Sequence, residues 1–191
     1  TPQDYEAVIN RFNNYYIPTA EECEAIFEIT GTSRDRISHG RATSRVSGAI
    51  GQALREAGQE VDIGLIMASA LLHDIAKGKP RHDEAGGEIL RGMGFDLAAD
   101  IVGVHTDLAG KLPDDVPLST KIVYLADKYV RGDTVVDLET RYQISREQYG
   151  KDPDIEKHVL LRKERALRAR QEIESLIGTP LERIVFAETG N

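Results

Sequence analysis

The chain is 191 residues long, and its 40% hydrophobic and 29% charged residues are the proportions of an ordinary globular protein. It has no run of about 18 or more uncharged apolar residues, so the sequence indicates no membrane-spanning helix. The 24 basic and 32 acidic residues give a net charge of −8, which opposes binding to a nucleic-acid backbone, because such binding depends on basic residues that displace counterions.

The sequence also indicates the surroundings in which the protein works. Cys23 is its one cysteine, which excludes an internal disulfide framework. The first residues, TPQDYEAVIN, are polar and lack the basic, apolar and small-residue order of a secretory signal. We therefore expect a cytoplasmic location, with no membrane and no nucleic acid as partner. The length favours one domain that spans residues 1–191.

Helical signals dominate along the chain, and no two alternating runs are joined by a hairpin turn, so the sequence predicts an all-α fold. Pro2 can begin a first helix that ends near Tyr16. Thr19 and Glu22 have the spacing of a capping box for the next helix, which ends before Gly31. We expect helices at about 2–16, 20–30, 35–57, 63–77, 83–93, 97–105, 118–131, 134–148 and 154–177, and a last one after Pro180. The helix at 154–177 is densely charged, which is typical of a solvated face.

The helix expected at 63–77 should be the buried centre of the fold. Asp62 can cap its start, and the segment 63–72 is apolar nearly all round. The sequence Gly-Lys-Pro at 78–80 ends the helix. His73 and Asp74 therefore interrupt the apolar run at the end of the most buried helix.

Other polar side chains lie among apolar neighbours. His39, His105 and Asp127 are each on the apolar face of their own predicted helix. Together with His73 and Asp74, they direct three histidines and two aspartates toward one core. Burial of a neutral polar group without a partner costs of order 2–7 kcal/mol, and burial of an ion costs more. A divalent metal is the simplest partner, because imidazole and carboxylate groups bind Mn, Fe, Co, Ni, Mg or Zn.

The order of these residues resembles a known signature. His39, then His73-Asp74, then Asp127 is similar to the H…HD…D signature of the HD-domain phosphohydrolase superfamily, over about residues 35–135. The sequence LLHDIAKG resembles the LLHDxxK helix end of that family, and ADK resembles the surroundings of its terminal aspartate. The resemblance implies a multi-helix HD-domain bundle with a metal site between its core helices.

The resemblance also assigns two further histidines. His82, in HDEAGGEIL, resembles the histidine of the family's H-x-x-x-G-A pattern, although Gly87 stands where that pattern has Ala. His105 resembles the late histidine of the two-metal branches, which include symmetrical diadenosine tetraphosphate hydrolases. The segment before His82 is much shorter here than in that branch. The implied ligands are His39, His73, Asp74 and Asp127 for a first ion, and Asp74, His82 and His105 for a second, with Asp74 bridging the two.

This ligand set implies a phosphohydrolase that acts on a nucleotide or another small phosphate ester or anhydride. Two ions about 3.5–4 Å apart can hold a water, lower its pKa and polarise the phosphoryl group that it attacks. The water is then the nucleophile, and Asp74 and Lys77 are the expected catalytic residues. Basic side chains must bind the phosphate. The expected ones are Lys79 and Arg81 in the segment AKGKPR, and Lys128 and Arg131 one helix away.

Two other functions stay open at this point. A minority branch of similar fold uses the same ligand order in a di-iron oxygenase, and some HD-like domains are regulatory modules that have lost catalysis. The GYP motif of cyclic-di-GMP phosphodiesterases is absent, which argues against that substrate. Asp83, beside His82, fits a helix start better than a metal ligand. The metal, the substrate and the oligomeric state do not follow from the sequence.

Overall fold

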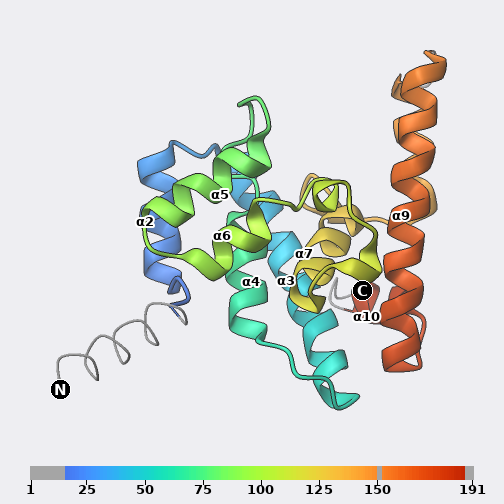
Figure 1. The fold of residues 1–191 in the computed structure, drawn as a ribbon, viewed down its shortest axis with the longest axis horizontal. Coiled ribbons are helices and arrows are strands. Elements are labelled where there is room, and N and C mark those ends of the chain that lie inside the picture. Colours follow the sequence, from blue (N-terminus) through green and yellow to red (C-terminus); the bar gives the residue numbers. More distant parts are fainter. Residues whose placement is uncertain (1–15, 150–151, 188–191) are drawn as a thin grey trace.

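The structure is a computed structural model that describes residues 16–149 and 152–187, and helices make up almost all of the regular structure in those segments (Figure 1). The all-α prediction is therefore confirmed. The helix expected at about 2–16 lies outside the described residues, apart from Tyr16. The α-helices are α2 (Ala20–Thr30), α3 (Arg34–Glu56), α4 (Ile63–Leu72), α5 (His82–Gly92), α6 (Asp96–Val102), α7 (Leu118–Tyr129), α8 (Leu138–Tyr149), α9 (Pro153–Ile177) and α10 (Leu181–Ala187). The short elements are the 3-10 turns η1 (Leu108–Gly110) and η2 (Pro113–Asp115) and the strands β1 (Val130–Arg131) and β2 (Thr134–Val135). No helix in the described segments is long and apolar enough to cross a membrane.

Two helix starts carry the caps that the sequence predicts. In the capping box of α2, the Glu22 N–H donates to the Thr19 hydroxyl, and the Glu22 carboxylate accepts from the Thr19 N–H at 2.8 Å. Gly31 ends α2 with a left-handed φ of 64°. The Asp62 carboxylate accepts from the Leu65 N–H at 3.0 Å and so caps α4. These local bonds fix where the two helices begin, and hence which faces they turn toward the core.

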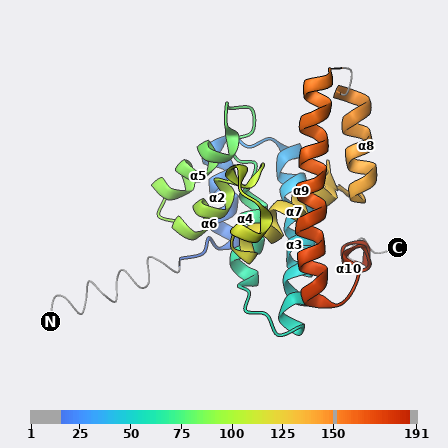
Figure 2. The same cartoon turned by 45° about the vertical axis from the view of Figure 1, so that its right-hand side comes forward.

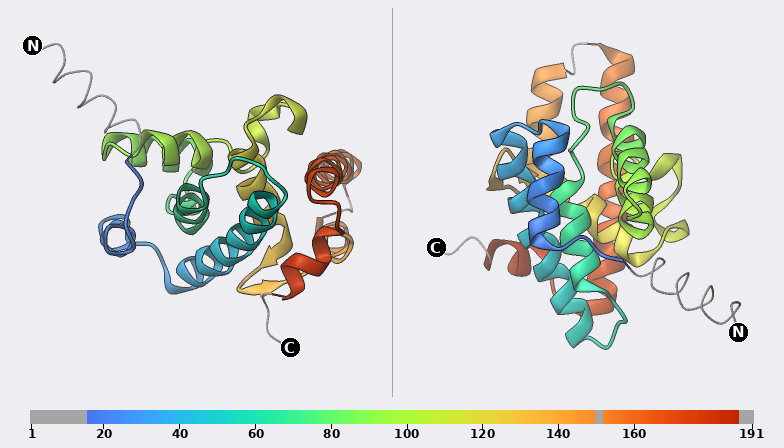
Figure 3. Two further views of the ribbon diagram at one scale, coloured as in Figure 1. Left: turned by 90° about the horizontal axis from the view of Figure 1, so that it is seen from below. Right: turned by 90° about the vertical axis from the view of Figure 1, so that its left-hand side faces the viewer.

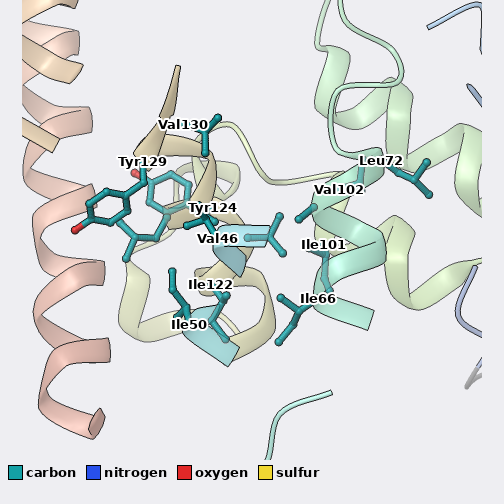
Figure 4. Packing of buried hydrophobic residues seen from close by; sticks show 14 of the residues in the cluster. Val46, Ile50, Ile66, Leu72, Ile101, Val102, Ile122, Tyr124, Tyr129 and Val130 are labelled. Carbon is teal, nitrogen blue, oxygen red and sulfur yellow. The ribbon is translucent and has the colours of Figure 1, made fainter. Parts of the chain in front are cut away.

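The core lies between α3, α4, α6 and α7 (Figure 4). Val46 and Ile50 of α3 and Ile66 of α4 are at most 1% exposed. Ile101 of α6 and Ile122 of α7 belong to the same cluster. Burial of a side chain of this size contributes about 1.5–3 kcal/mol relative to leaving it exposed. The helix α4 is thus the buried central helix that the sequence predicts.

The helices α8 and α9 lie side by side and pack against α7 (Figure 2). α9 has 25 residues and buries Ala166, Ala169 and Ile173. Figure 3 shows α2 and α9 on opposite sides of the central helices. The helices α8 and α9 therefore form a wall on one side of α7.

A short hairpin follows α7, where the sequence predicts helix. The strands β1 and β2 are antiparallel, with Val130 opposite Val135 and Arg131 opposite Thr134. Gly132, with a φ of 63°, is in the turn between them. Each strand has two residues, which is too short for an alternating pattern to be recognised. The predictions of helix at 130–131 and 134–137, and of a chain without a hairpin, are therefore wrong.

The helices α4 and α6 end earlier than predicted. α4 ends at Leu72 rather than near 77, and α6 ends at Val102 rather than near 105. After α4 the backbone continues in turns, in which the Ile75 N–H donates to the carbonyl of Leu72 at 3.2 Å. The rings of His73 and His105 each donate from Nδ1 to a carbonyl near the end of the preceding helix, and so satisfy groups that a helix leaves unpaired. His105 therefore points inward from a turn, and not through helical spacing.

Candidate metal centre

The six side chains that the sequence selects as metal ligands converge where α3, α7 and the start of α5 meet the turns after α4 and α6. Five of them are buried, and the sixth, His82, has a side chain that is 18% exposed. The set consists of His39 on α3, His73 and Asp74 after α4, His82 on α5, His105 after α6, and Asp127 on α7.

Backbone carbonyls fix the rings of three of these histidines. His39 Nδ1 lies 2.7 Å from the carbonyl oxygen of Gly132 in the β1–β2 turn. His73 Nδ1 lies 2.7 Å from the carbonyl oxygen of Ala70, and His105 Nδ1 lies 2.8 Å from that of the last α6 residue. Because a carbonyl can only accept, each Nδ1 carries a proton, and the lone pair of the neutral ring is on Nε2. Metal-binding histidines are oriented in this way, by a hydrogen bond from the other ring nitrogen.

Two of these Nε2 atoms face one oxygen of Asp127. The distances to Asp127 Oδ1 are 3.0 Å from His39 Nε2 and 3.4 Å from His73 Nε2. A neutral ring nitrogen and a carboxylate oxygen both accept, so these contacts are favourable only where a proton or a cation lies between them. His73 Nε2 is buried and has no hydrogen-bond partner among the described residues. A buried polar atom of this kind needs a partner such as a metal ion.

Asp74 lies between the other two histidines. Its Oδ1 is 3.3 Å from His82 Nε2 and 3.5 Å from His105 Nε2. Potential ligand atoms thus form two groups, in each of which all atoms lie within 4.8 Å of one another. The groups are His39, His73 and Asp74, and Asp74, His82 and His105. Imidazole and carboxylate donors fit divalent transition metals, so the residues present suit a metal centre with Asp74 in both groups.

Both carboxyl groups have a lowered pKa in the folded protein. Burial favours the neutral acid at Asp74, but the adjacent rings of His105 and His82 outweigh it and lower the pKa of this carboxyl. Burial acts in the same direction at Asp127, where the charge of Lys128 and the adjacent rings of His39 and His73 hold the pKa well below its usual range. The centre therefore offers two negative charges to a cation.

Three cationic side chains contact these carboxylates. Lys77 Nζ lies 3.3 Å from Asp74 Oδ1, and Arg36 Nη1 lies 3.4 Å from Asp74 Oδ2. Lys128 Nζ lies 2.7 Å from Asp127 Oδ2, and both residues are buried. Burial lowers the pKa of Lys128, although the charge of Asp127 opposes this change. The carboxylates are thus balanced by side chains that also adjoin the space in front of the centre.

Two clefts open onto the centre. The first, of about 220 Å³, lies against His82, His105 and Asp127. The second, of about 260 Å³, lies against His39, Asp74 and Asp127. The other residues that line these clefts could not be predicted from the sequence, because most of them belong to charged helices, whose pattern is typical of a solvated face. The residues missed in this way include Arg141, Ser145 and Tyr149 of α8 in both clefts, Arg162 of α9 in the first, and Arg36 of α3 in the second.

The predicted phosphate-binding residues lie in different places. Lys77 lines both clefts, Lys128 lines the first and Arg131 lines the second. Lys79 and Arg81 are exposed and line neither cleft, and Arg81 forms an ion pair with a neighbouring glutamate at 2.9 Å. Of these five basic residues, Lys77, Lys128 and Arg131 therefore lie next to the centre. That any of the five contacts a substrate stays a prediction.

The region of the chain that contains these six side chains is similar to a known protein family. Residues 36–132 match the family model described as HD domain, and this stretch holds all six converging side chains. An uncharacterized protein of Methanocaldococcus jannaschii is 30% identical in an alignment of 149 positions, and the alignment covers 69% of this chain and 88% of that protein. No solved structure gives a significant match.

Proposed function

This chain belongs to the HD domain family, whose members are mostly metal-dependent hydrolases, and on that premise we propose that it is a phosphohydrolase. The proposed reaction is the hydrolysis of a small phosphate ester or anhydride, in which divalent metal ions activate the attacking water molecule. The proposed cofactor is a pair of divalent ions, with Mn, Fe, Co, Ni, Mg and Zn as candidates.

The observation that carries this proposal is the membership of Asp74 in two groups of ligand atoms at once. A carboxylate has two oxygens and can contact two ions. Ions held close together lower the pKa of a bound water and polarise the phosphoryl oxygens between them. The proposed ligands are His39, His73, Asp74 and Asp127 for one ion, and Asp74, His82 and His105 for the other.

Cations of the chain supply further charge stabilisation in this proposal. Lys77 and Lys128 line the first cleft beside His82 and His105. Ammonium groups in this position can donate hydrogen bonds to phosphoryl oxygens, whose negative charge grows in the transition state. Lys77 is the more accessible of the two, because its side chain is 38% exposed whereas Lys128 is buried. We therefore assign the catalytic role to Lys77.

A nucleotide is the substrate that the clefts favour. Tyr149 lines both clefts and is 59% exposed, so its ring offers a face on which a base can stack. The resemblance of His105 to the late histidine of the branch that includes symmetrical diadenosine tetraphosphate hydrolases supports a phosphoanhydride as the bond that is cleaved. A nucleoside or dinucleoside polyphosphate combines the two features.

Substitution of Asp74 tests the proposed function. Phosphate release is measured from nucleotides, dinucleoside polyphosphates and sugar phosphates with several divalent metals, and bound metal is counted by elemental analysis. We expect D74N to lower kcat/KM about a hundredfold or more, because even the loss of an outer partner of a metal ligand costs 10- to 100-fold. D83N is the matched control, since Asp83 belongs to the second His-Asp pair and to neither group of ligand atoms. Its activity and metal content should stay near those of the wild type.

Other outcomes would identify other functions. Hydrolysis that survives D74N would remove Asp74 from the bridging role. A stable, redox-active iron pair that consumes oxygen with an organic substrate, together with no phosphatase activity, would identify an oxygenase. A protein that binds no metal and hydrolyses none of the compounds would be a regulatory module.

A further inference from the structure

The first cleft has a wall that lies outside the part of the chain that matches the family. Residues 36–132 match the HD domain, whereas α8 and α9 follow this region. Arg141 of α8 and Arg162 of α9 nevertheless line the same cleft as Lys77, His82 and His105. The two helices lie side by side at this edge of the molecule (Figure 2). The C-terminal helices therefore add their own side chains to the space in front of the metal centre.

Neither guanidinium group of this wall is paired with a carboxylate in the described part of the chain. Arg141 donates to the backbone carbonyls of Val130 and Asp127, the second at 3.4 Å. Arg162 accepts a hydrogen bond at its own carbonyl from the Tyr142 hydroxyl at 3.1 Å, and its side chain has no bond to any residue that the structure describes. Carbonyl groups carry no net charge, so they do not compensate the charge of Arg141. No carboxylate of the described residues compensates the positive charge of either arginine beside the cleft.

The first cleft is consequently a positive region of an acidic protein. Four cations and one carboxylate line it, while the whole chain has a net charge of −8. Lys128 is balanced by Asp127 at 2.7 Å, and Lys77 pairs with a carboxylate of the metal centre. The excess charge therefore comes from Arg141 and Arg162. A local positive potential concentrates anions, and the planar guanidinium group can bind two phosphoryl oxygens at once.

We propose that Arg141 and Arg162 form a second anion subsite, which binds a phosphoryl group other than the one that is cleaved. The inference rests on the proposed function, in which the cleaved group lies at the metal centre beside His82 and His105 in the same cleft. The substrate is accordingly a molecule with at least two phosphoryl groups, such as a nucleoside diphosphate or a longer polyphosphate. Arg162 then determines specificity between substrates with one and with two phosphoryl groups.

AMP and ADP are suitable probes, because they differ by one phosphoryl group. The ratio of kcat/KM for ADP to kcat/KM for AMP is measured for the wild type and R162Q, and the dissociation constants of both nucleotides for the EDTA-treated protein give a second ratio. We expect R162Q to reduce the preference for ADP about tenfold in both measurements, the usual effect of losing one charge-assisted hydrogen bond. R146Q is the matched control, because Arg146 is also on α8 but pairs with Glu156 at 2.8 Å and lines neither cleft.

The two proposals can fail separately. R141Q should reduce the preference for ADP as R162Q does. Because Arg141 also donates hydrogen bonds to backbone carbonyls, its substitution can disturb the fold, and R162Q is therefore the decisive variant. An unchanged preference in R162Q, or an equal loss for AMP and ADP, would overturn the anion subsite and leave the hydrolase intact. If the wild type hydrolyses other phosphate esters but neither nucleotide, the ratio of dissociation constants decides in the same way. A wild type that hydrolyses no phosphate compound would overturn the proposed function and the subsite with it.

Discussion

The ammonium group of Lys77 has two kinds of possible partner, the ligand atoms of the candidate metal centre and an anion in the clefts. Its Nζ lies 3.3 Å from Asp74 Oδ1 and 3.3 Å from His82 Nε2, both of which are potential ligand atoms. A divalent ion at these atoms would replace the ammonium group as the partner of Asp74, because a doubly charged ion binds a carboxylate more strongly. The released side chain adjoins both clefts, where a phosphoryl group would be its next anionic partner.

Substitution of Lys77 should therefore affect catalysis and not metal binding. We expect K77M to lower kcat/KM about 10²- to 10³-fold, which is the usual cost of losing a group that stabilises transition-state charge. The rise in thermal stability with Mn²⁺ should remain. Steady-state kinetics and melting curves measure the two effects. A variant that loses both together would show that Lys77 supports the metal centre itself. A comparable loss of activity in K79M would show that the exposed loop reaches the substrate, as the sequence predicts.

The residues of the candidate metal centre could be selected from the sequence, whereas the arginines of the cleft could not. His73 and Asp74 interrupt an apolar run, and this contrast is visible along the chain. Arg141 and Arg162 lie in charged helices, in which an arginine beside a cleft has the same pattern as one in water. Their position depends on how α8 and α9 pack against α7. His105 lies between these cases, because its burial follows from its neighbours but its orientation depends on the turn after α6.

The contact between α3 and α4 sets the spacing of the first group of ligand atoms. A Cβ atom on Gly40 would lie 2.3 Å from the carbonyl oxygen of Leu71, so no side chain fits between the two helices at that point. Gly40 follows His39, and Leu71 stands two residues before His73. The same close approach of the backbones therefore brings His39 and His73 together.

The variant G40A tests this contact at the level of the two helices. We expect it to lower the free energy of unfolding by about 1–3 kcal/mol, the usual cost of overpacking, although alanine is favoured over glycine in a helix by about 1 kcal/mol. G48A is the matched control in the same helix, because its Cβ would meet Met67 Sδ at 2.9 Å and this flexible side chain can move. Urea denaturation gives both free energies. If G40A is as stable as G48A, the helices do not need glycine at their closest approach.

The metal centre joins parts of the chain that are far apart in sequence. His39 and Asp127 are separated by 88 positions, and the remaining candidate ligands come from α5 and from the turns after α4 and α6. The helices themselves could be predicted, because caps and apolar stripes are local patterns. Apolar faces also predict that five of these side chains point toward one core, but the distances between them could not be derived from such patterns, because they depend on the packing of the whole molecule. The unfolded chain does not hold these groups together, so an ion should bind the folded state selectively.

Addition of Mn²⁺ should therefore raise the midpoint of thermal unfolding of the whole molecule. At a free concentration one hundred times the dissociation constant, binding to the folded state alone stabilises it by about 2.7 kcal/mol. In a protein of this size each kcal/mol shifts the midpoint by about 2–4 °C, so we expect a rise of about 5–11 °C that EDTA reverses. D83N should keep this rise, and D74N should lose most of it, because Asp74 belongs to both groups of ligand atoms. Melting curves followed by circular dichroism measure the effect, and an equal rise in wild type and D74N would place the ions elsewhere on this acidic chain.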